Sequence, residues 1–499
     1  MNRFLPLLFG SVALAAHADI TERQRQIIEQ KLAGTYNPLS FFDGKLVVDV
    51  QERLRVELRD NNFDFRDAAN ASTDDAWLLQ RFRLGVLVKP TAWLRLYAQG
   101  QDTREIGSDR DNVPFVLGAE GDDPFDLRQA YVEISNHAEC PWGLKVGRQE
   151  LSYGDERLIG GFEWNNFART FDAVKLRYQD NPRRFWVDAF AAHVVTIRDV
   201  GPQGNYGWHF NDADWNDTFL GVYGGTTRWL SQTTEAYFLY RNKESSNPRY
   251  FDDATPTPNA ARAYDIQQEI YTVGLRLKST PGKLAGFDYE AEAAGQWGRA
   301  HGRSGAAFPG PASQDHRAWA AMVRGGHTWK DWAWKPRLGV EYSVASGDEN
   351  PDDDRHESFL NLFPTNHKFY GYMDFFAWKN IHNPSVQLKV TPYQDKTHAW
   401  KNLWVQLDCH AFWLFTNEDA WYRANGVATV RPVNTAARNA DRYVGSEFDL
   451  TVGYAPLKWL RLLAGYSHFF AGDYLADTAT ATAGRDDADF AYLQTVITF

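Results

Sequence analysis

The segment Phe490-Ala-Tyr-Leu-Gln-Thr-Val-Ile-Thr-Phe499 indicates the fold most clearly, because it alternates between two faces and stops on an aromatic residue. Leu493, Ile497 and Phe499 share one of these faces. On a soluble protein, an exposed apolar strand of this kind would be an aggregation hazard. The same strand is well suited to closing a membrane barrel, with one face toward lipid and the other toward a polar lumen.

The beginning of the chain points to export. Residues 1–18 contain a basic residue, an apolar run and a final Ala-His-Ala that fits an A-x-A cleavage site. We therefore expect a signal peptide over 1–18, a periplasmic leader over 19–44 and an outer-membrane β-barrel over 45–499. The leader fits either a short helix capped by Thr21 or a loosely ordered segment.

The composition agrees with a barrel. After the expected signal peptide there is no run of 18 or more apolar residues, which excludes a helical membrane protein. The mean hydropathy is −0.51, as expected where only alternate residues meet lipid. Aromatic residues make up 15% of the chain, with 19 Trp, which suits two interfacial belts. Cys140 and Cys409 are too few for a disulfide scaffold, and we interpret both as structural thiols.

Alternation recurs along the whole chain. In the segment 46–59, aliphatic residues occupy one face, broken only by Glu52, and charged or amide residues occupy the other. We count about 18 such segments, which predict an all-β, antiparallel transmembrane barrel. They lie at 46–59, 77–89, 92–101, 125–135, 143–150, 171–179, 184–193, 217–224, 233–242, 268–278, 286–298, 317–329, 335–345, 384–391, 402–414, 444–454, 459–470 and 489–499.

The connections alternate in length. Short ones follow the even-numbered segments, and long, polar, Gly- and Asp-rich ones follow the odd-numbered segments. This is typical of bacterial barrels with short periplasmic turns and long extracellular loops. On the short side, Trp residues at the junctions of turns and strands indicate a periplasmic aromatic belt. These are Trp93, Trp142, Trp229, Trp334, Trp404 and Trp459.

About 18 strands leave an aqueous channel, so the inward face should carry the function. Alternation places many Arg residues there, with Asp and Glu facing them. Two interpretations remain open: an anion- or sugar-selective constriction, or charges that pair with each other and brace the barrel. The inward residues predicted on strands include Arg53, Arg55, Arg81, Arg83, Arg95, Arg177, Glu290, Arg337, Glu341, Glu447 and Asp449.

Two loop regions add candidate residues. The region 147–172 contains Arg, Asp, Asn and Trp side chains, which hold sugar hydroxyls and carboxylates but equally hold an inward-folded loop against the wall. Its candidates are Arg148, Asp155, Arg157, Arg169 and Asp172, although Arg148 has the parity of the lipid-facing Val146. In the region 346–380, a cluster of aspartates offers oxygen ligands for Ca²⁺, but its spacing matches no EF-hand. These residues are Asp348, Asp352, Asp353 and Asp354.

The chain also resembles the alginate-export family of outer-membrane channels. The resemblance is carried by Gly147-Arg-Gln149, Gly154-Asp155, Arg169-Thr-Phe-Asp172, Pro336-Arg-Leu-Gly-Val-Glu-Tyr342, Ala345-Ser-Gly-Asp348 and Leu362-Phe-Pro-Thr-Asn-His-Lys-Phe-Tyr-Gly-Tyr-Met-Asp374. It implies a monomeric 18-stranded barrel whose Arg-rich constriction passes an acidic polysaccharide. The long loop 346–383 looks more like that of uncharacterised relatives than that of the alginate exporter.

These patterns predict a passive bacterial outer-membrane channel for an anionic or hydroxyl-rich saccharide. The alternative is a general or small-solute uptake porin of the same architecture. A barrel enzyme is a third alternative, but it needs a nucleophile, a base and an acid, and no G-x-S-x-G stretch is present. We expect no cofactor apart from the weak Ca²⁺ candidate. Expected partners are the solute, outer-membrane lipid and lipopolysaccharide, and the barrel-assembly machinery, with no nucleic acid.

Overall fold

A computed structural model gives the fold of most of the chain. It describes residues 39–68, 70, 72–110, 120–197, 210–229, 231–244, 268–280, 283–300, 304–305, 308–309, 313–393, 395 and 397–499. The expected signal peptide and most of the expected leader lie outside these residues. No helix in the described ranges is long and apolar enough to cross a membrane.

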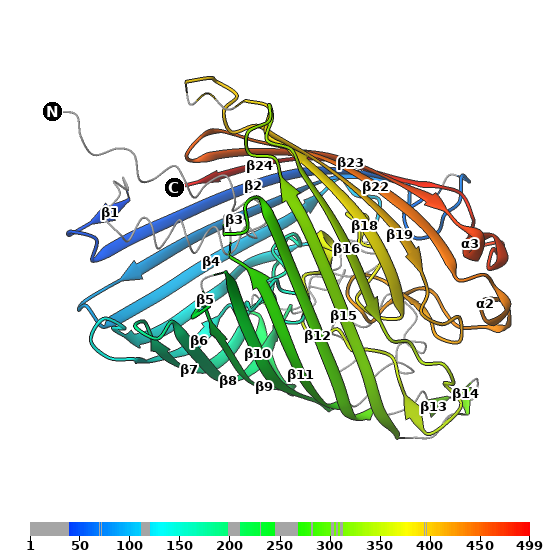
Figure 1. Ribbon diagram of the computed structural model, residues 1–499, viewed down its shortest axis with the longest axis horizontal. Coiled ribbons are helices and arrows are strands. Elements are labelled where there is room, and N and C mark those ends of the chain that lie inside the picture. The colour runs from blue at the N-terminus through cyan, green and yellow to red at the C-terminus, as the bar shows by residue number, and fades with distance from the viewer. Residues whose placement is uncertain are drawn as a thin grey trace.

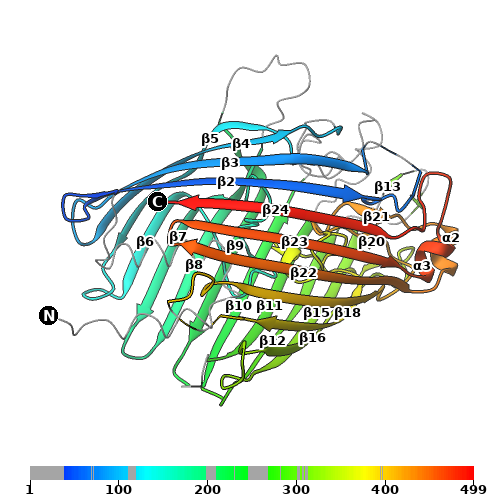
Figure 2. The ribbon, with the colours of Figure 1, turned by 90° about the horizontal axis from the view of Figure 1, so that it is seen from above.

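Eighteen antiparallel strands close into one barrel (Figures 1 and 2). They are β2 Leu46–Asp60, β3 Asp75–Val88, β4 Leu94–Ile106, β5 Asp123–Ser135, β6 Trp142–Gln149, β7 Phe171–Asp180, β8 Phe185–Thr196, β9 Asp212–Thr226, β10 Gln232–Lys243, β11 Gln268–Ser279, β12 Phe287–Ala300, β15 Gln314–Thr328, β16 Arg337–Ala345, β18 Ile381–Val390, β19 Trp404–Trp413, β22 Tyr443–Leu457, β23 Leu460–Ala471 and β24 Ala488–Thr498. Each of the predicted segments forms one of these strands.

Short elements accompany the barrel. β1 (Ser40–Phe41) pairs with the start of β2. The others lie in the long connections: β13 Ser304–Gly305, β14 Phe308–Pro309, β17 Arg355–His356, η3 Asn366–Lys368, β20 Trp421–Tyr422, β21 Thr429–Arg431, α2 Thr435–Asn439 and α3 Asp473–Asp477.

The C-terminal strand closes the barrel as predicted. β24 pairs with β2 from Gln51↔Thr498 to Asp60↔Asp489. The backbone N–H of Phe499 donates to the carbonyl of Val50 at 3.0 Å. The C-terminus and the start of β2 lie at the end of the barrel that carries the short turns, and α2 and α3 lie at the opposite end (Figure 2).

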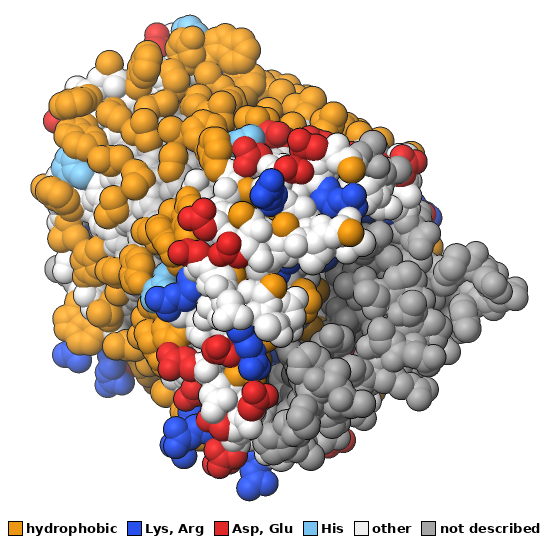
Figure 3. All heavy atoms as spheres, turned by 90° about the vertical axis from the view of Figure 1, so that its right-hand side faces the viewer, with side chains coloured by type: hydrophobic (Ala, Val, Ile, Leu, Met, Phe, Trp, Pro, Cys, Tyr) orange, Lys and Arg blue, Asp and Glu red, His pale blue; other side chains and the backbone are white. Residues whose placement is uncertain are grey.

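The outer surface is apolar because alternate residues point away from the lumen. Side chains such as Leu54, Val174, Leu275 and Val340 are exposed on this face. Figure 3 looks onto the end with the long connections, where acidic and basic side chains gather, while hydrophobic side chains cover the adjoining barrel wall. Charged residues on a lipid-facing wall would be destabilising, which explains the confinement of most strand charges to the other parity.

Two details of the prediction are corrected. Five of the six belt Trp residues are exposed at the short turns, but Trp404 shares the inward parity of Gln406 and Asp408. The Lys389 ammonium lies over its ring at 4.1 Å. The cysteines are not buried structural thiols: Cys140 and Cys409 are both free and exposed.

Candidate functional site

Loop 150–170, which connects β6 and β7, folds into the lumen. Its residues Leu151, Leu158 and Ile159 are buried in an apolar cluster with side chains of the wall. Backbone hydrogen bonds join it to loop 346–380, which connects β16 and β18: Phe363 N–H donates to Leu158 O at 3.0 Å, and Gly160 N–H donates to Phe363 O at 2.8 Å. The two inward loops therefore support each other and fill part of the lumen.

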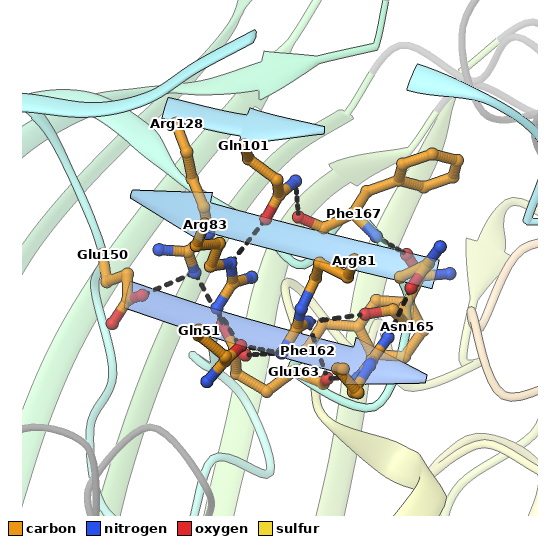
Figure 4. A network of polar contacts seen from close by, with 12 residues as sticks. Gln51, Arg81, Arg83, Gln101, Arg128, Glu150, Phe162, Glu163, Asn165 and Phe167 are labelled. Carbon is orange, nitrogen blue, oxygen red and sulfur yellow. Dashed lines mark hydrogen bonds and ion pairs between the residues drawn. The ribbon is translucent and has the colours of Figure 1, made fainter. Parts of the chain in front are cut away.

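The wall opposite loop 150–170 presents three arginines to one carboxylate (Figure 4). Arg81 and Arg83 lie on β3, Arg128 lies on β5, and all three contact Glu163 of the loop. The nitrogen–oxygen distances are 3.0 Å from Arg81, 2.9 Å from Arg83 and 2.5 Å from Arg128. Glu150 also forms an ion pair with Arg128, with a nitrogen–oxygen distance of 2.5 Å. Charge-assisted bonds of this length are strong, particularly where water is excluded.

The neighbouring strand β2 holds the backbone of the same loop. Arg53 donates to Glu163 O at 2.8 Å and to the Asn166 side-chain oxygen at 2.7 Å. Arg55 donates to Trp164 O at 2.6 Å, and its guanidinium lies 4.0 Å from the centre of the Trp164 ring. These arginines are fully buried. Of the two interpretations of the Arg cluster, the contacts seen are those of a brace that holds an inward loop.

The Arg cluster changes the electrostatics of the loop carboxylates. Burial alone would raise the pKa of Glu163, but Arg83, Arg81 and Arg128 hold it below its ordinary value. Glu163 is therefore an anion within the cluster. Glu120 forms an ion pair with Arg55 at 2.8 Å. Despite this partner, burial raises the pKa of Glu120 to about 7. The Glu163 carboxylate is therefore the main negative charge that balances the positive charges of Arg81 and Arg83.

A second polar cluster lies across the lumen. Arg157 donates to Glu341 at 2.6 Å and to the Tyr370 hydroxyl at 2.8 Å. Arg324 on β15 contacts Asp155 at 2.8 Å and also pairs with Glu290, which accepts from Arg276 at 2.7 Å. The predicted residues Asp155, Arg157, Glu290 and Glu341 therefore come together around both inward loops.

Of three further predicted residues, Arg169 and Glu447 contact these loops, and Asp449 pairs within the wall. Arg169 donates to the carbonyls of Gly160 and Pro364, both at 3.0 Å. Glu447 accepts from the backbone N–H of Met373 in loop 346–380 at 3.0 Å. Asp449 accepts from the Ser467 hydroxyl at 2.5 Å and lies 3.9 Å from His410. Arg169 therefore joins the two loops to each other, and Glu447 joins loop 346–380 to the wall at β22.

Toward the short turns, the inward cations are more accessible. Arg95, Arg177 and Arg337 have side-chain exposures of 34%, 36% and 22%. Lys278 is 39% exposed, whereas its partner Glu290 is 2% exposed. Arg177 pairs at 2.7 Å with Asp188, whose side chain is fully buried. We call Arg95, Arg177, Lys278 and Arg337 the vestibule cations.

Two predicted pore residues face the wrong way. Arg148 and Asp172 are register partners on β6 and β7 and form an ion pair of 2.8 Å. They have the parity of the exposed residues Val146 and Val174. The register of β6 and β7 contains no bulge that would turn them inward, so this pair lies on the outer face near the long connections.

The aspartates suggested for Ca²⁺ do not converge. Asp348 is buried, and its backbone N–H donates to Asp419 at 3.1 Å. Asp352 is 64% exposed and contacts Arg438 at 3.5 Å. Asp353 and Asp354 border β17, where the Asp354 carbonyl accepts from Asp315. Within the described ranges, no group of three or more His, Cys, Asp or Glu is placed to hold a metal ion.

Sequence reasoning missed Arg128 and Glu163. A β-bulge at Gln99/Gly100 shifts the register of β4 and β5, so strict alternation assigns Arg128 to the wrong face. Glu163 sits in a connection without periodicity, 80 residues from Arg83. Only its place in a candidate loop beside Trp164 could have drawn attention to it.

The comparisons agree with this architecture. The alginate export family model matches residues 45–489. The structure of OccAB3 from Acinetobacter baumannii has a TM-score of 0.59 and 10% identity, covering 91% of this chain and 99% of that chain. OccK11 (OpdR) from Pseudomonas aeruginosa has a TM-score of 0.52 and 14% identity, covering 91% and 96%.

A third similar structure is that of Pseudomonas aeruginosa OpdK, solved with vanillate. It has a TM-score of 0.53 and 12% identity, and the match covers 91% of this chain and 98% of OpdK. Identities this low show the fold alone. A comparison with curated proteins found no match. The family match spans nearly the whole barrel, so the chain belongs to the alginate export family and is a channel-type β-barrel of the bacterial outer membrane.

Proposed function

We propose that this chain is a passive outer-membrane channel for an anionic or hydroxyl-rich saccharide. The observation that carries the proposal is the unequal exposure of the two partners in two of the four vestibule ion pairs. At Arg177–Asp188 and Lys278–Glu290 the cation is accessible while the acid is almost completely buried. A solute in this part of the lumen therefore meets the positive partner first.

This arrangement favours anions for a physical reason. Charges of one sign along a low-dielectric wall focus the potential and raise the local concentration of the opposite ion. The guanidinium groups of Arg95, Arg177 and Arg337 can also donate two parallel hydrogen bonds to a carboxylate or bridge sugar hydroxyls. Membership of the alginate export family supports an acidic saccharide as the solute.

A small-solute uptake porin is the second candidate. Its support is the fold shared with OpdK, whose structure was solved with vanillate, a small aromatic carboxylate. Both candidates need a lumen that prefers anions, and they differ in the size of the solute that passes the inward loops. Neither includes a catalytic step.

The proposal is tested by neutralising vestibule cations in the purified full-length protein. The double variant Arg177→Gln/Lys278→Gln should lower anion-over-cation selectivity, read as a shift of the reversal potential in planar bilayers under a salt gradient. The acids keep other partners, since Asp188 retains Lys175 at 3.8 Å and Glu290 retains Arg276. The barrel should therefore stay folded.

The matched control is Arg183→Gln. Arg183 is 80% exposed and pairs with Asp180 at the turn between β7 and β8. This variant removes one Arg charge outside the lumen and should leave the reversal potential unchanged. An unchanged potential in the folded double variant would contradict the proposed role of the vestibule cations.

A further inference from the structure

We propose that Glu163 is a built-in substitute for the carboxylate of the solute. It occupies the guanidinium site of Arg81, Arg83 and Arg128 in the closed channel, and an anionic solute takes its place and releases loop 150–170. The inference deepens the proposed function and rests on it, because it requires a solute that carries a carboxylate or an equivalent anion.

The first support is the geometry of the site. Arg83 donates to both oxygens of Glu163, at 3.1 Å and 2.9 Å. Arg81 and Arg128 each donate to one of them, at 3.0 Å and 2.5 Å. A carboxylate has about four lone-pair sites, and the cluster fills them from three directions. Nothing in this arrangement depends on the carboxylate being attached to the protein.

The second support is a surplus of donors. Arg53 Nε, Arg81 Nε and the second terminal nitrogen of Arg83 are buried and have no acceptor among the described residues. The side chains of Arg53 and Arg81 are fully buried, and that of Arg83 is 2% exposed. Unpaired buried donors are energetically unfavourable. An anion with more oxygens than Glu163, such as a uronic acid with its carboxylate and ring hydroxyls, could satisfy them.

The third support is the way the loop is held. At residues 163–166, wall arginines bind the loop through the Glu163 carboxylate and through neutral oxygens, namely the carbonyls of residues 163–165 and the Asn166 side chain. Hydroxyl oxygens of a solute can replace such acceptors. This part of the loop offers the wall the same chemistry, one carboxylate with several neutral oxygens, that an acidic saccharide would offer.

These contacts make release dependent on a ligand. If the loop left without a replacement, the buried ion pairs of Arg81 and Arg83 with Glu163 would be broken with no new counter-ion, which is unfavourable. Exchange of one carboxylate for another avoids that state. The site can be approached at Glu150, whose side chain is 11% exposed and which shares Arg128 with Glu163.

The test measures loop release by thiol labelling. The exposed native thiols are first removed with Cys140→Ser and Cys409→Ser, and Asn165→Cys then places a reporter in the loop, since Asn165 is 8% exposed. In reconstituted protein, labelling by a hydrophilic maleimide should be slow. It should accelerate on the order of tenfold with a uronic-acid oligosaccharide. A neutral oligosaccharide of equal length should have little effect.

In the same background, Glu163→Gln should give fast labelling without any ligand and remove the response to the uronic acid. Glu150→Gln is the matched control, because it removes one carboxylate from the same Arg cluster at the residue that directly follows β6, where the strand already fixes the backbone. Its labelling should stay slow. If Glu163→Gln does not fold, Glu163→Asp, which keeps the charge on a shorter side chain, should label at an intermediate rate.

The outcomes separate the inference from the proposed function. Slow, ligand-independent labelling in folded Glu163→Gln would overturn the inference. Passage of uronic acid through the wild-type barrel without faster labelling would overturn the inference while leaving the proposed function intact. Faster labelling without passage would support the release of the loop and contradict the proposed function.

Discussion

Replacement of Arg83 by Gln tests whether the Arg cluster holds the inward loop. In the structure, Arg83 makes two charged hydrogen bonds to Glu163 and one to Gln101 at 2.6 Å. A glutamine side chain can remake the last of these, but it cannot reach Glu163 in the same way. The change therefore removes a salt bridge between groups that are almost completely buried.

The magnitude follows from these contacts. Hydrogen bonds to charged groups are worth about 1.5–3 kcal/mol each. The loss is partly offset because Arg83 no longer repels Arg81 and Arg128. A net destabilisation of the closed loop by about 2–3 kcal/mol remains, which corresponds to about 30- to 150-fold faster local opening.

Hydrogen exchange measures this opening directly. The informative amides are those that join the two inward loops, Gly160, Phe363 and Thr365, whose acceptors are Phe363 O, Leu158 O and Glu156 O. Their exchange should accelerate in Arg83→Gln, while amides of strand pairs outside both polar clusters, such as β18–β19, should not change. Arg183→Gln serves as the charge-matched control. Exchange of the loop amides at the wild-type rate in a folded Arg83→Gln barrel would refute the reasoning.

Three further predictions concern orientation, assembly and pH. Asp352→Cys should be labelled on intact cells by an impermeant thiol reagent and native Cys140 should not, and the reverse pattern would contradict the orientation. Phe499→Ser should reduce the amount of folded barrel that shows heat-modifiable migration on gels, because it removes the ring that stacks on Trp459 with 5.8 Å between the ring centres. A wild-type amount of heat-modifiable barrel in this variant would count against the prediction. Burial and the nearby Asp419 raise the pKa of Asp348 to about 7, above its unfolded value of about 3.9. Its stabilising contribution is therefore complete below the unfolded pKa and is lost as pH rises toward 7. Amides near Asp348 should exchange faster at pH 8 than at pH 5 after correction for intrinsic rates, and Asp348→Asn should abolish this difference.

The barrel could be predicted because its signal is local. Each strand separates lipid from lumen, so period-two alternation appears within every segment, and the wall side chains of β2, β3 and β24 follow it. The closing contact of Phe499 with Val50 follows from the same pattern. Parity also gave reason to doubt Arg148, which does lie on the outer face. It failed at Arg128, because this residue is the extra one of a β-bulge in β5, which is not visible in alternation.

The site itself could be predicted only in part. Arg53, Arg55, Arg81 and Arg83 were placed on the inward face, but their main partner Glu163 was not recognised. Pairing between a wall residue and a loop residue depends on how the loop folds back into the lumen, and no sequence period encodes that path.

Solute flux tests the central claim most directly. Liposomes that contain the purified full-length protein should release a trapped uronic-acid oligosaccharide faster than a neutral oligosaccharide of the same length. The difference should shrink in Arg177→Gln/Lys278→Gln and persist in Arg183→Gln. Equal release of both saccharides by the wild-type protein, or faster release of the neutral one, would contradict an anion-preferring saccharide channel.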